Sequence, residues 1–244
     1  MKAAPAPTAK AAEVHAGFAL ARVFTALKAH DVMCHGLVYP MVATMLQRRG
    51  GRLNFLDLGC GDGTDIGTIL KALQLTGYTG IDSSQPTLMK AQEHLASLSC
   101  PVRLLHGDYA LAWTFPPSTF DVVWLGLFLH HVPTIAKLDF LTRIFGLLKP
   151  GGLLLAHDPL LKEDEDRTGF IERLERHGHQ HWQFLTPEEM AVAGRHWRQH
   201  GHQEPYSALQ TMGYQAGFSE VRLLWSDPQA FYGLVLFARG DERP

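Results

Sequence analysis

The chain lacks several features that would place it in a specialised protein class. Its 244 residues include only three cysteines, Cys34, Cys60 and Cys100, too few and too scattered for a disulfide framework or a thiolate zinc site. No apolar run approaches the length of a membrane span, and no signal-peptide pattern follows the first residues. We therefore expect a soluble protein of a reducing compartment, the cytoplasm, with no membrane partner.

A marked excess of charge of either sign is also missing. The chain has 22 basic and 24 acidic residues spread along its length, with a net charge of -2. No strong field favours nucleic acid or an anionic membrane surface, so we expect neither as a partner. The apolar fraction of 46% is ample for a buried core in one α/β domain. A monomer and a homodimer both stay open.

A glycine-rich turn follows the first apolar strand pattern. Residues 52–64 join that strand and Asp57 to three alternating glycines, Gly59, Gly61 and Gly63. Glycines at this spacing let the backbone bend sharply and let a ligand approach the main chain just before a helix begins. The dinucleotide fingerprint GxGxxG would need a third glycine where the chain has Thr64. The turn predicts a nucleotide-type ligand and argues against a dinucleotide.

Charge around the turn narrows the choice of ligand. Asp57, Asp62 and Asp65 would repel a pyrophosphate, which prefers an amide-rich helix start. S-adenosylmethionine has no phosphate, and its ammonium and sulfonium suit carboxylates. The segment resembles motif I of the class I S-adenosylmethionine-dependent methyltransferases. The resemblance covers residues 52–158 by motif and 206–239 by pattern, and it implies S-adenosylmethionine as the cofactor.

The order of apolar segments predicts the fold. Strand patterns alternate with helical ones, which favours a parallel sheet covered on both faces, and a short turn then joins two last strands as an antiparallel hairpin. We expect an α/β, doubly wound, mostly parallel seven-stranded sheet with that C-terminal hairpin. The predicted strands are residues 53–58, 77–82, 102–106, 120–126, 152–157, 221–225 and 231–238.

Two parts of the chain lie outside this alternation. Residues 1–50 are expected to be an N-terminal leader and helices packing on the core, with helical spacing at Val14–Leu27 and Leu37–Leu46. Residues 51–244 are expected to be the methyltransferase domain, within which residues 160–205 form a helical cap or lid. The second lid helix should start at Thr186, which begins a capping box.

Two strand-end acids follow the glycine turn in order. Asp82 comes about twenty residues later, where a βαβ unit presents an acid to ribose hydroxyls, although a helix cap is an equal alternative in isolation. Asp108 follows the third strand; the resemblance implies contact with the adenine amino group, and ordinary turn chemistry is the alternative. The cofactor-binding residues expected from the resemblance are Asp57, Gly59, Cys60, Gly61, Asp82, Ser83, Asp108, Tyr109 and Leu125.

Adjacent histidines follow the fourth strand. In the family that the chain resembles, this strand end lines the methionine part of the cofactor, and a following histidine often faces the substrate. His131 matches that position and His130 is its neighbour. A neutral histidine can take a proton from the acceptor, so we assign catalysis to His131, with His130 as the weaker candidate. Packing under the next helix is the alternative.

The acceptor is expected to be a small molecule. The Asp/Asn-Pro-Pro-aromatic turn of base amino methylation is replaced by Leu-Gly-Leu-Phe at 125–128, and no Pro-Cys nucleophile is present. Aromatic residues of the N-terminal helices and the lid region could line the acceptor pocket, although aromatics at helical spacing are more often core. These candidates are Tyr39, Trp182, Phe184, Trp197 and Tyr206.

Six histidines in the lid region invite a metal interpretation. Pairs one helical turn apart can share a divalent ion, but no carboxylate joins them in a zinc pattern, so we expect no metal site. They are His177, His179, His181, His196, His200 and His202. Two other functions stay open: an inactive S-adenosylmethionine-binding regulatory or assembly subunit, and a nicotinamide-dependent oxidoreductase.

Overall fold

The computed structural model describes residues 20–241, apart from the side chain of Thr68. They divide into two compact units. The smaller unit covers residues 20–33 and Asp166–Gly201, and the larger covers Cys34–Glu165 and residues 202–241. Within this part of the chain, no helix has the length and apolar character needed to cross a membrane.

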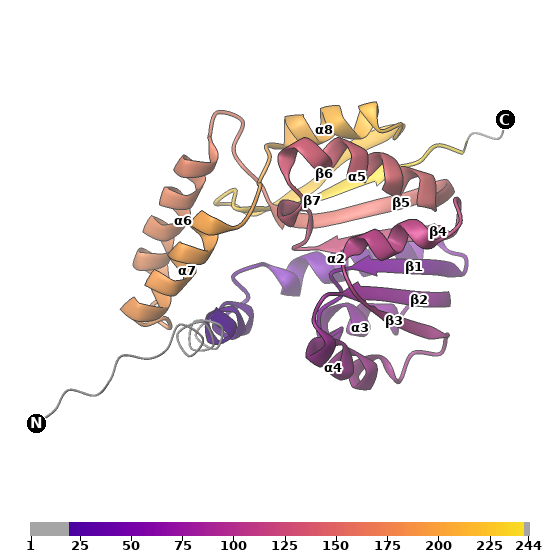
Figure 1. Cartoon of the computed structure of the whole chain (residues 1–244), viewed down its shortest axis with the longest axis horizontal. Helices are drawn as coiled ribbons and strands as arrows, with labels where there is room; N and C mark the ends of the chain where they lie inside the picture. The colour runs from indigo at the N-terminus through magenta and orange to yellow at the C-terminus, as the bar shows by residue number, and fades with distance from the viewer. Residues whose placement is uncertain (1–19, 242–244) are drawn as a thin grey trace, which may run out of the picture. The chain divides into compact units, whose positions relative to one another are not determined.

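The larger unit is built on a seven-stranded sheet in the order β3-β2-β1-β4-β5-β7-β6 (Figure 1). The first five strands are parallel, and β7 is antiparallel to both β5 and β6. The predicted fold is confirmed. The strands are β1 Leu53–Leu58, β2 Leu75–Asp82, β3 Val102–His106, β4 Phe120–Gly126, β5 Leu148–Pro159, β6 Glu220–Ser226 and β7 Tyr232–Ala238.

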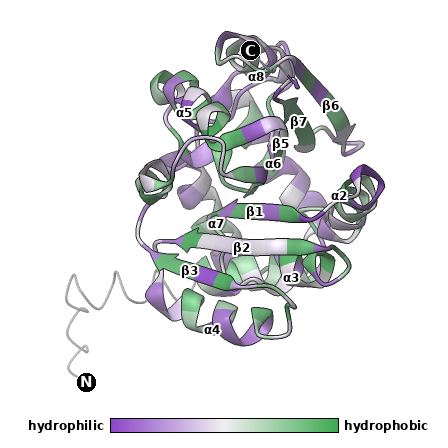
Figure 2. Ribbon diagram, turned by 90° about the vertical axis from the view of Figure 1, so that its right-hand side faces the viewer, coloured by the Kyte–Doolittle hydropathy of each residue, from purple (hydrophilic) through white to green (hydrophobic). Residues whose placement is uncertain are grey.

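Helices cover both faces of this sheet, which explains why its central strands are almost continuously apolar. Side chains alternate along β1, so that Phe55 packs in one core and Leu56 in the other. One face carries α2 (His35–Arg49), α3 (Thr64–Leu70) and α4 (Gln85–Leu95); Figure 2 shows α4 beside the edge strand β3. The other face carries α5 (Thr134–Leu147) and α8 (Tyr206–Gln215).

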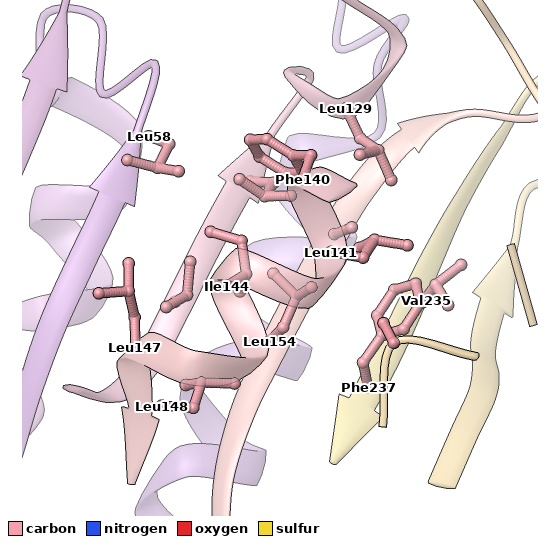
Figure 3. Close-up of a cluster of buried hydrophobic side chains, with 14 of the residues drawn as sticks. Leu58, Leu129, Phe140, Leu141, Ile144, Leu147, Leu148, Leu154, Val235 and Phe237 are labelled. Carbon is pink, nitrogen blue, oxygen red and sulfur yellow. The ribbon is translucent and has the colours of Figure 1, made fainter. Parts of the chain in front are cut away.

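The core beneath α5 fixes the strands whose ends carry the candidate site. Phe140, Leu141 and Ile144 of α5 pack against Leu154 of β5 and Phe237 of β7 (Figure 3). All five are at most 2% exposed. Burial of each such side chain contributes about 1.5–3 kcal/mol, so this layer holds α5 firmly against β5 and β7.

The smaller unit is helical, with α6 (Arg167–His181), α7 (Pro187–Gln199) and helical residues 20–29. The predicted start of α7 is present: Glu189 N–H donates to Thr186 Oγ1 at 3.2 Å, and Thr186 N–H donates to Glu189 Oε2 at 2.9 Å. The predicted helix Val14–Leu27 begins outside the described residues.

His157, on β5, is a fully buried histidine. Neither of its ring nitrogens has a hydrogen-bond partner among the described residues. Its ring centroid lies 5.7–6.5 Å from four other rings, those of His35, Tyr39, Trp225 and Tyr232. Burial, aided by nearby His35, lowers the pKa of His157 to about 3, so the ring is neutral at pH 7.

Replacing Gly213 by alanine should destabilise the larger unit. Gly213 is on α8, and a Cβ there would lie 2.6 Å from Val221 Cγ2 and 2.8 Å from Phe237 Cδ1. Overpacking of this kind costs about 1–3 kcal/mol. Gly146→Ala on α5 is the matched control, because a Cβ there meets nothing within 4 Å and alanine favours a helix by about 1 kcal/mol. Chemical denaturation should show that Gly213→Ala lowers the free energy of unfolding and that Gly146→Ala raises it. Equal changes in the two variants would contradict the packing around Gly213.

Stability should fall in acid partly because of His157. A histidine in the unfolded chain has a pKa near 6.5. As the pH falls below that value, the unfolded state binds a proton that the folded state does not bind, so unfolding becomes more favourable. Between pH 7 and pH 5 this linkage removes about 2 kcal/mol from the free energy of unfolding. His157→Leu should flatten the pH dependence of urea unfolding by that amount, whereas exposed His179→Leu should not. A pH dependence unchanged by His157→Leu would show that the pKa of this ring is the same in the folded and unfolded states.

Candidate functional site

The turn between β1 and α3 is shaped by backbone that only glycine adopts easily. Gly59, Gly61 and Gly63 have φ angles of 73°, 55° and 68°, in the left-handed region. A Cβ on Gly59 would lie 2.5 Å from Phe128 Cδ2, so a side chain is excluded there by contact as well. The Gly59 N–H donates to Ile81 O at 2.8 Å, which closes the turn over the end of β2.

Asp82 holds this turn from the neighbouring strand. Its Oδ2 accepts from the Gly61 N–H at 3.0 Å, and its Oδ1 accepts from the Ser84 N–H at 2.8 Å, just before α4. The carboxylate thus joins the glycine turn to the start of α4. Because two carboxylate oxygens offer about four acceptor positions, Asp82 keeps capacity for ligand hydroxyls.

Asp57 lies beneath the turn rather than on the cavity wall. It is buried and accepts from the Tyr78 hydroxyl at 2.8 Å. Burial raises the pKa of Asp57 to about 7, although the Tyr78 hydrogen bond opposes the shift. Burial also raises the pKa of the Cys60 thiol far above its ordinary range, which makes Cys60 an unreactive packing residue.

A cavity of about 420 Å³ opens at the carboxyl ends of β1, β2 and β3, beside the point where strand order reverses. Open α/β sheets bind ligands at this place. We call it the glycine-turn cavity. It is lined by Gly59, Ile81, Asp82, Ser83, Gly107, Asp108, Tyr109, Leu127, Phe128 and His131.

The cavity gathers part of the predicted cofactor set. Gly59, Asp82, Ser83, Asp108 and Tyr109 line it. The other four predicted residues, Asp57, Cys60, Gly61 and Leu125, are not on its wall. Gly61 contributes through its hydrogen bond to Asp82, and Leu125 is fully buried in β4.

Sequence reasoning missed the apolar wall. Leu127 has a φ of 54°, which is uncommon for a non-glycine residue, and it turns the chain after β4 so that Phe128 reaches Gly59. Tyr109 packs edge-to-face on Phe128 with centroids 5.9 Å apart. Gly126 directly precedes this bend, but the positive φ falls on Leu127, a residue type that does not itself signal such a conformation.

Electrostatics of the cavity favour a ligand without phosphate. Asp82 and Asp108 are on its wall, and the described residues that line it include no lysine or arginine. Asp108 also accepts from the Ala110 N–H at 2.7 Å and so caps the short helix η1 (Tyr109–Thr114). Two acids beside apolar rings suit hydroxyls, amino groups and cations rather than anions.

His131 and His130 lie on the turn η2 (Leu129–His131) after β4. His131 lines the cavity, and its catalytic assignment stays a prediction. His130 Nδ1 lies 2.9 Å from Oδ1 of buried Asp158 on β5. An ionised carboxylate can only accept, so with Asp158 in that form Nδ1 of His130 is the donor. The two imidazole centroids are 4.0 Å apart.

None of the five predicted substrate-lining aromatics is on the cavity wall. Tyr39 packs against Trp124 with centroids 5.4 Å apart, and the Tyr206 hydroxyl donates to Val221 O at 3.0 Å. The other three are in the smaller unit. There Trp182 packs on Trp197 at 5.9 Å, and Phe184 stacks on His30 at 3.8 Å. Their assignment to an acceptor pocket stays a prediction.

The lid-region histidines form two pairs in the smaller unit. The centroids of His177 and His181 are 4.4 Å apart, and those of His196 and His200 are 4.8 Å apart. Across residues 20–241, no group of three or more potential ligands is arranged to hold a metal ion. A pair of imidazoles supplies only half of a tetrahedral zinc site.

Comparison with known proteins places this site in a family. Residues 55–152 match a family model described as a methyltransferase domain. The carboxy-S-adenosyl-L-methionine synthase of Hydrogenovibrio crunogenus is 32% identical over 122 residues, covering 49% of this chain and 47% of that protein. The 27-O-demethylrifamycin SV methyltransferase of Amycolatopsis mediterranei is also 32% identical over 122 residues, covering 49% and 43%. The chain thus spans about half the length of the curated relatives it matches.

Solved structures share the fold. The apo form of the S-adenosylmethionine-dependent methyltransferase SibL superposes with a TM-score of 0.58 at 19% identity, covering 84% of this chain and 55% of that one. At this identity the likeness concerns the fold alone. The domain match thus identifies residues 55–152 as part of a methyltransferase domain, and the sheet order of the larger unit is that of the Rossmann-like methyltransferase fold.

Proposed function

We propose that this chain binds S-adenosylmethionine in the glycine-turn cavity and transfers its methyl group to a small-molecule acceptor. The observation that carries the proposal is the convergence of the glycine turn, Asp82 and Asp108 on one cavity without a cationic side chain on its described wall. The related 27-O-demethylrifamycin SV methyltransferase of Amycolatopsis mediterranei is named for a small-molecule acceptor, which supports this acceptor class.

The residues present fit this cofactor. Gly59 lets a ligand approach the main chain where a Cβ would collide with Phe128. Asp82 would accept from ribose hydroxyls while its bonds to Gly61 and Ser84 keep it fixed. Asp108 would accept from the adenine amino group, and the Tyr109 and Phe128 rings would cover its apolar surface.

The chain's own residues have limited chemistry to perform. When bound, S-adenosylmethionine would supply a sulfonium-bound methyl group for in-line displacement by the acceptor atom, with S-adenosylhomocysteine as the leaving group. The protein positions the acceptor atom opposite that sulfur and excludes water, and these two effects can supply much of the acceleration. His131, on the cavity wall, would take the proton from an acceptor that is protonated at neutral pH.

Binding measurements test the cofactor assignment without knowledge of the acceptor. Asp82→Ala should weaken the binding of S-adenosylhomocysteine by about 10-fold to 100-fold, because charged hydrogen bonds to ribose are lost. Asp139→Asn is the control, since Asp139 is an exposed residue of α5 paired only locally with Arg143. Calorimetry should also show a higher affinity for S-adenosylmethionine than for NAD. Tighter binding of NAD would contradict the proposal and support the alternative of a nicotinamide-dependent oxidoreductase.

Turnover measurements test His131. With an acceptor found by screening small molecules for S-adenosylhomocysteine formation, His131→Ala should lower kcat by about 10²-fold to 10⁴-fold for an acceptor that must lose a proton. The affinity for S-adenosylhomocysteine should stay close to that of the unchanged chain. Unaltered turnover across pH would remove the base assignment. Cofactor binding with no product from any acceptor class would instead favour a regulatory subunit.

A further inference from the structure

A buried ion pair lies close to the turn η2 (Leu129–His131), which we call the histidine turn. Lys137, on α5, has only 1% of its side chain exposed, and its ammonium lies 3.0 Å from Glu204 Oε1. The Thr134 hydroxyl donates to the same oxygen at 2.6 Å. A buried ammonium is costly, and burial lowers the pKa of Lys137 while Glu204 opposes the shift. An apolar side chain could fill this position without that cost, which points to a role beyond packing.

The pair holds a short extended segment, residues 202–205, which we call the anchored segment. The Lys137 ammonium donates to His202 O as well as to Glu204. On the other side of the segment, Leu161 N–H donates to Glu204 O at 3.1 Å. A side-chain ion pair and main-chain hydrogen bonds therefore fix the same few residues from α5 and from the end of β5.

The anchored segment is bonded directly to the histidine turn. The His202 N–H donates to His130 O at 2.6 Å. Asp158 holds the ring of the same histidine through Nδ1, and the charge of Lys137 also interacts with Asp158. His130 is thus fixed at its main chain by His202 and at its ring by Asp158, and Lys137 interacts with both.

We propose that Lys137 and Glu204 are positioning residues, which hold the turn Leu129–His131 through His202 so that His131 stays on the wall of the glycine-turn cavity. The inference rests on the proposed function for its catalytic consequence. The anchoring itself depends only on the contacts within the larger unit. His130 transmits the constraint, because it directly precedes His131 in the chain and the centroids of the two rings are 4.0 Å apart.

Three variants and one control separate positioning from general stability. Lys137→Met and Glu204→Ala remove the pair, whereas Glu204→Gln keeps an acceptor oxygen for Lys137 and Thr134. Lys149→Met is the control, because it removes a lysine whose partner, Asp121 at 2.7 Å, is at the opposite end of β4 from the histidine turn.

The first readout is NMR of the chain labelled with ¹⁵N-histidine, which needs no acceptor. In the unchanged chain, the Nδ1 proton of His130 and the amide proton of His202 should both exchange slowly with water. Lys137→Met and Glu204→Ala should speed exchange of that amide by about 10-fold or more and weaken the ring signal. Glu204→Gln should keep most of the slow exchange at His202 and most of the His130 ring signal. Lys149→Met should change neither the exchange rate nor the ring signal.

The second readout is turnover. Lys137→Met and Glu204→Ala should lower kcat by about 10-fold to 100-fold, the effect of misplacing a catalytic group, with nearly unchanged affinity for S-adenosylhomocysteine. If Lys137→Met does not fold, the Glu204 series decides the matter. Unchanged exchange at His202 in Glu204→Ala, or an equal loss of kcat in Lys149→Met, would overturn the positioning role. NMR changes in a chain that forms no S-adenosylhomocysteine would keep the anchoring and overturn the proposed function instead.

Discussion

The architecture of the candidate site depends on one constraint, the sharp bend of the main chain after β1. Three glycines in left-handed conformations make the bend, and the carboxylate of Asp82 fixes it by accepting from both Gly61 and Ser84. This places bare backbone next to a strand-end acid at the point where strand order reverses. The bare backbone of Gly59 leaves room for Phe128, and Asp82 supplies one of the two acids of the cavity wall.

Charge is arranged in two layers around this bend. Asp82 and Asp108 are on the cavity wall, whereas Asp57 is buried beneath it against Tyr78. A buried acid whose pKa is raised to about 7 carries only partial charge near neutral pH. This arrangement explains why a ligand with hydroxyl, amino and cationic groups fits better than a pyrophosphate.

The sequence predicted those parts of the molecule that depend on local pattern. Strands appear as apolar runs, the bend as alternating glycines, and Asp82 as the acid after the second strand, because each signal lies within a few residues. The bend at Leu127 could not be predicted, since its positive φ falls on a leucine and not on the preceding Gly126. Contacts such as Lys137 with Glu204, 67 positions apart, depend on the completed fold. The assignment of the five aromatic residues to an acceptor pocket stays a prediction, because helical spacing does not show which face of a helix an aromatic side chain occupies.

The central claim is that the glycine-turn cavity holds the adenosine end of the methyl donor. A crystal structure of the chain with S-adenosylhomocysteine tests it most directly. We expect the ribose hydroxyls at the carboxylate of Asp82, the adenine beside Asp108, and the sulfur toward the end of β4 near His131. A ligand bound elsewhere, or bound here with its ribose away from Asp82, would contradict the account.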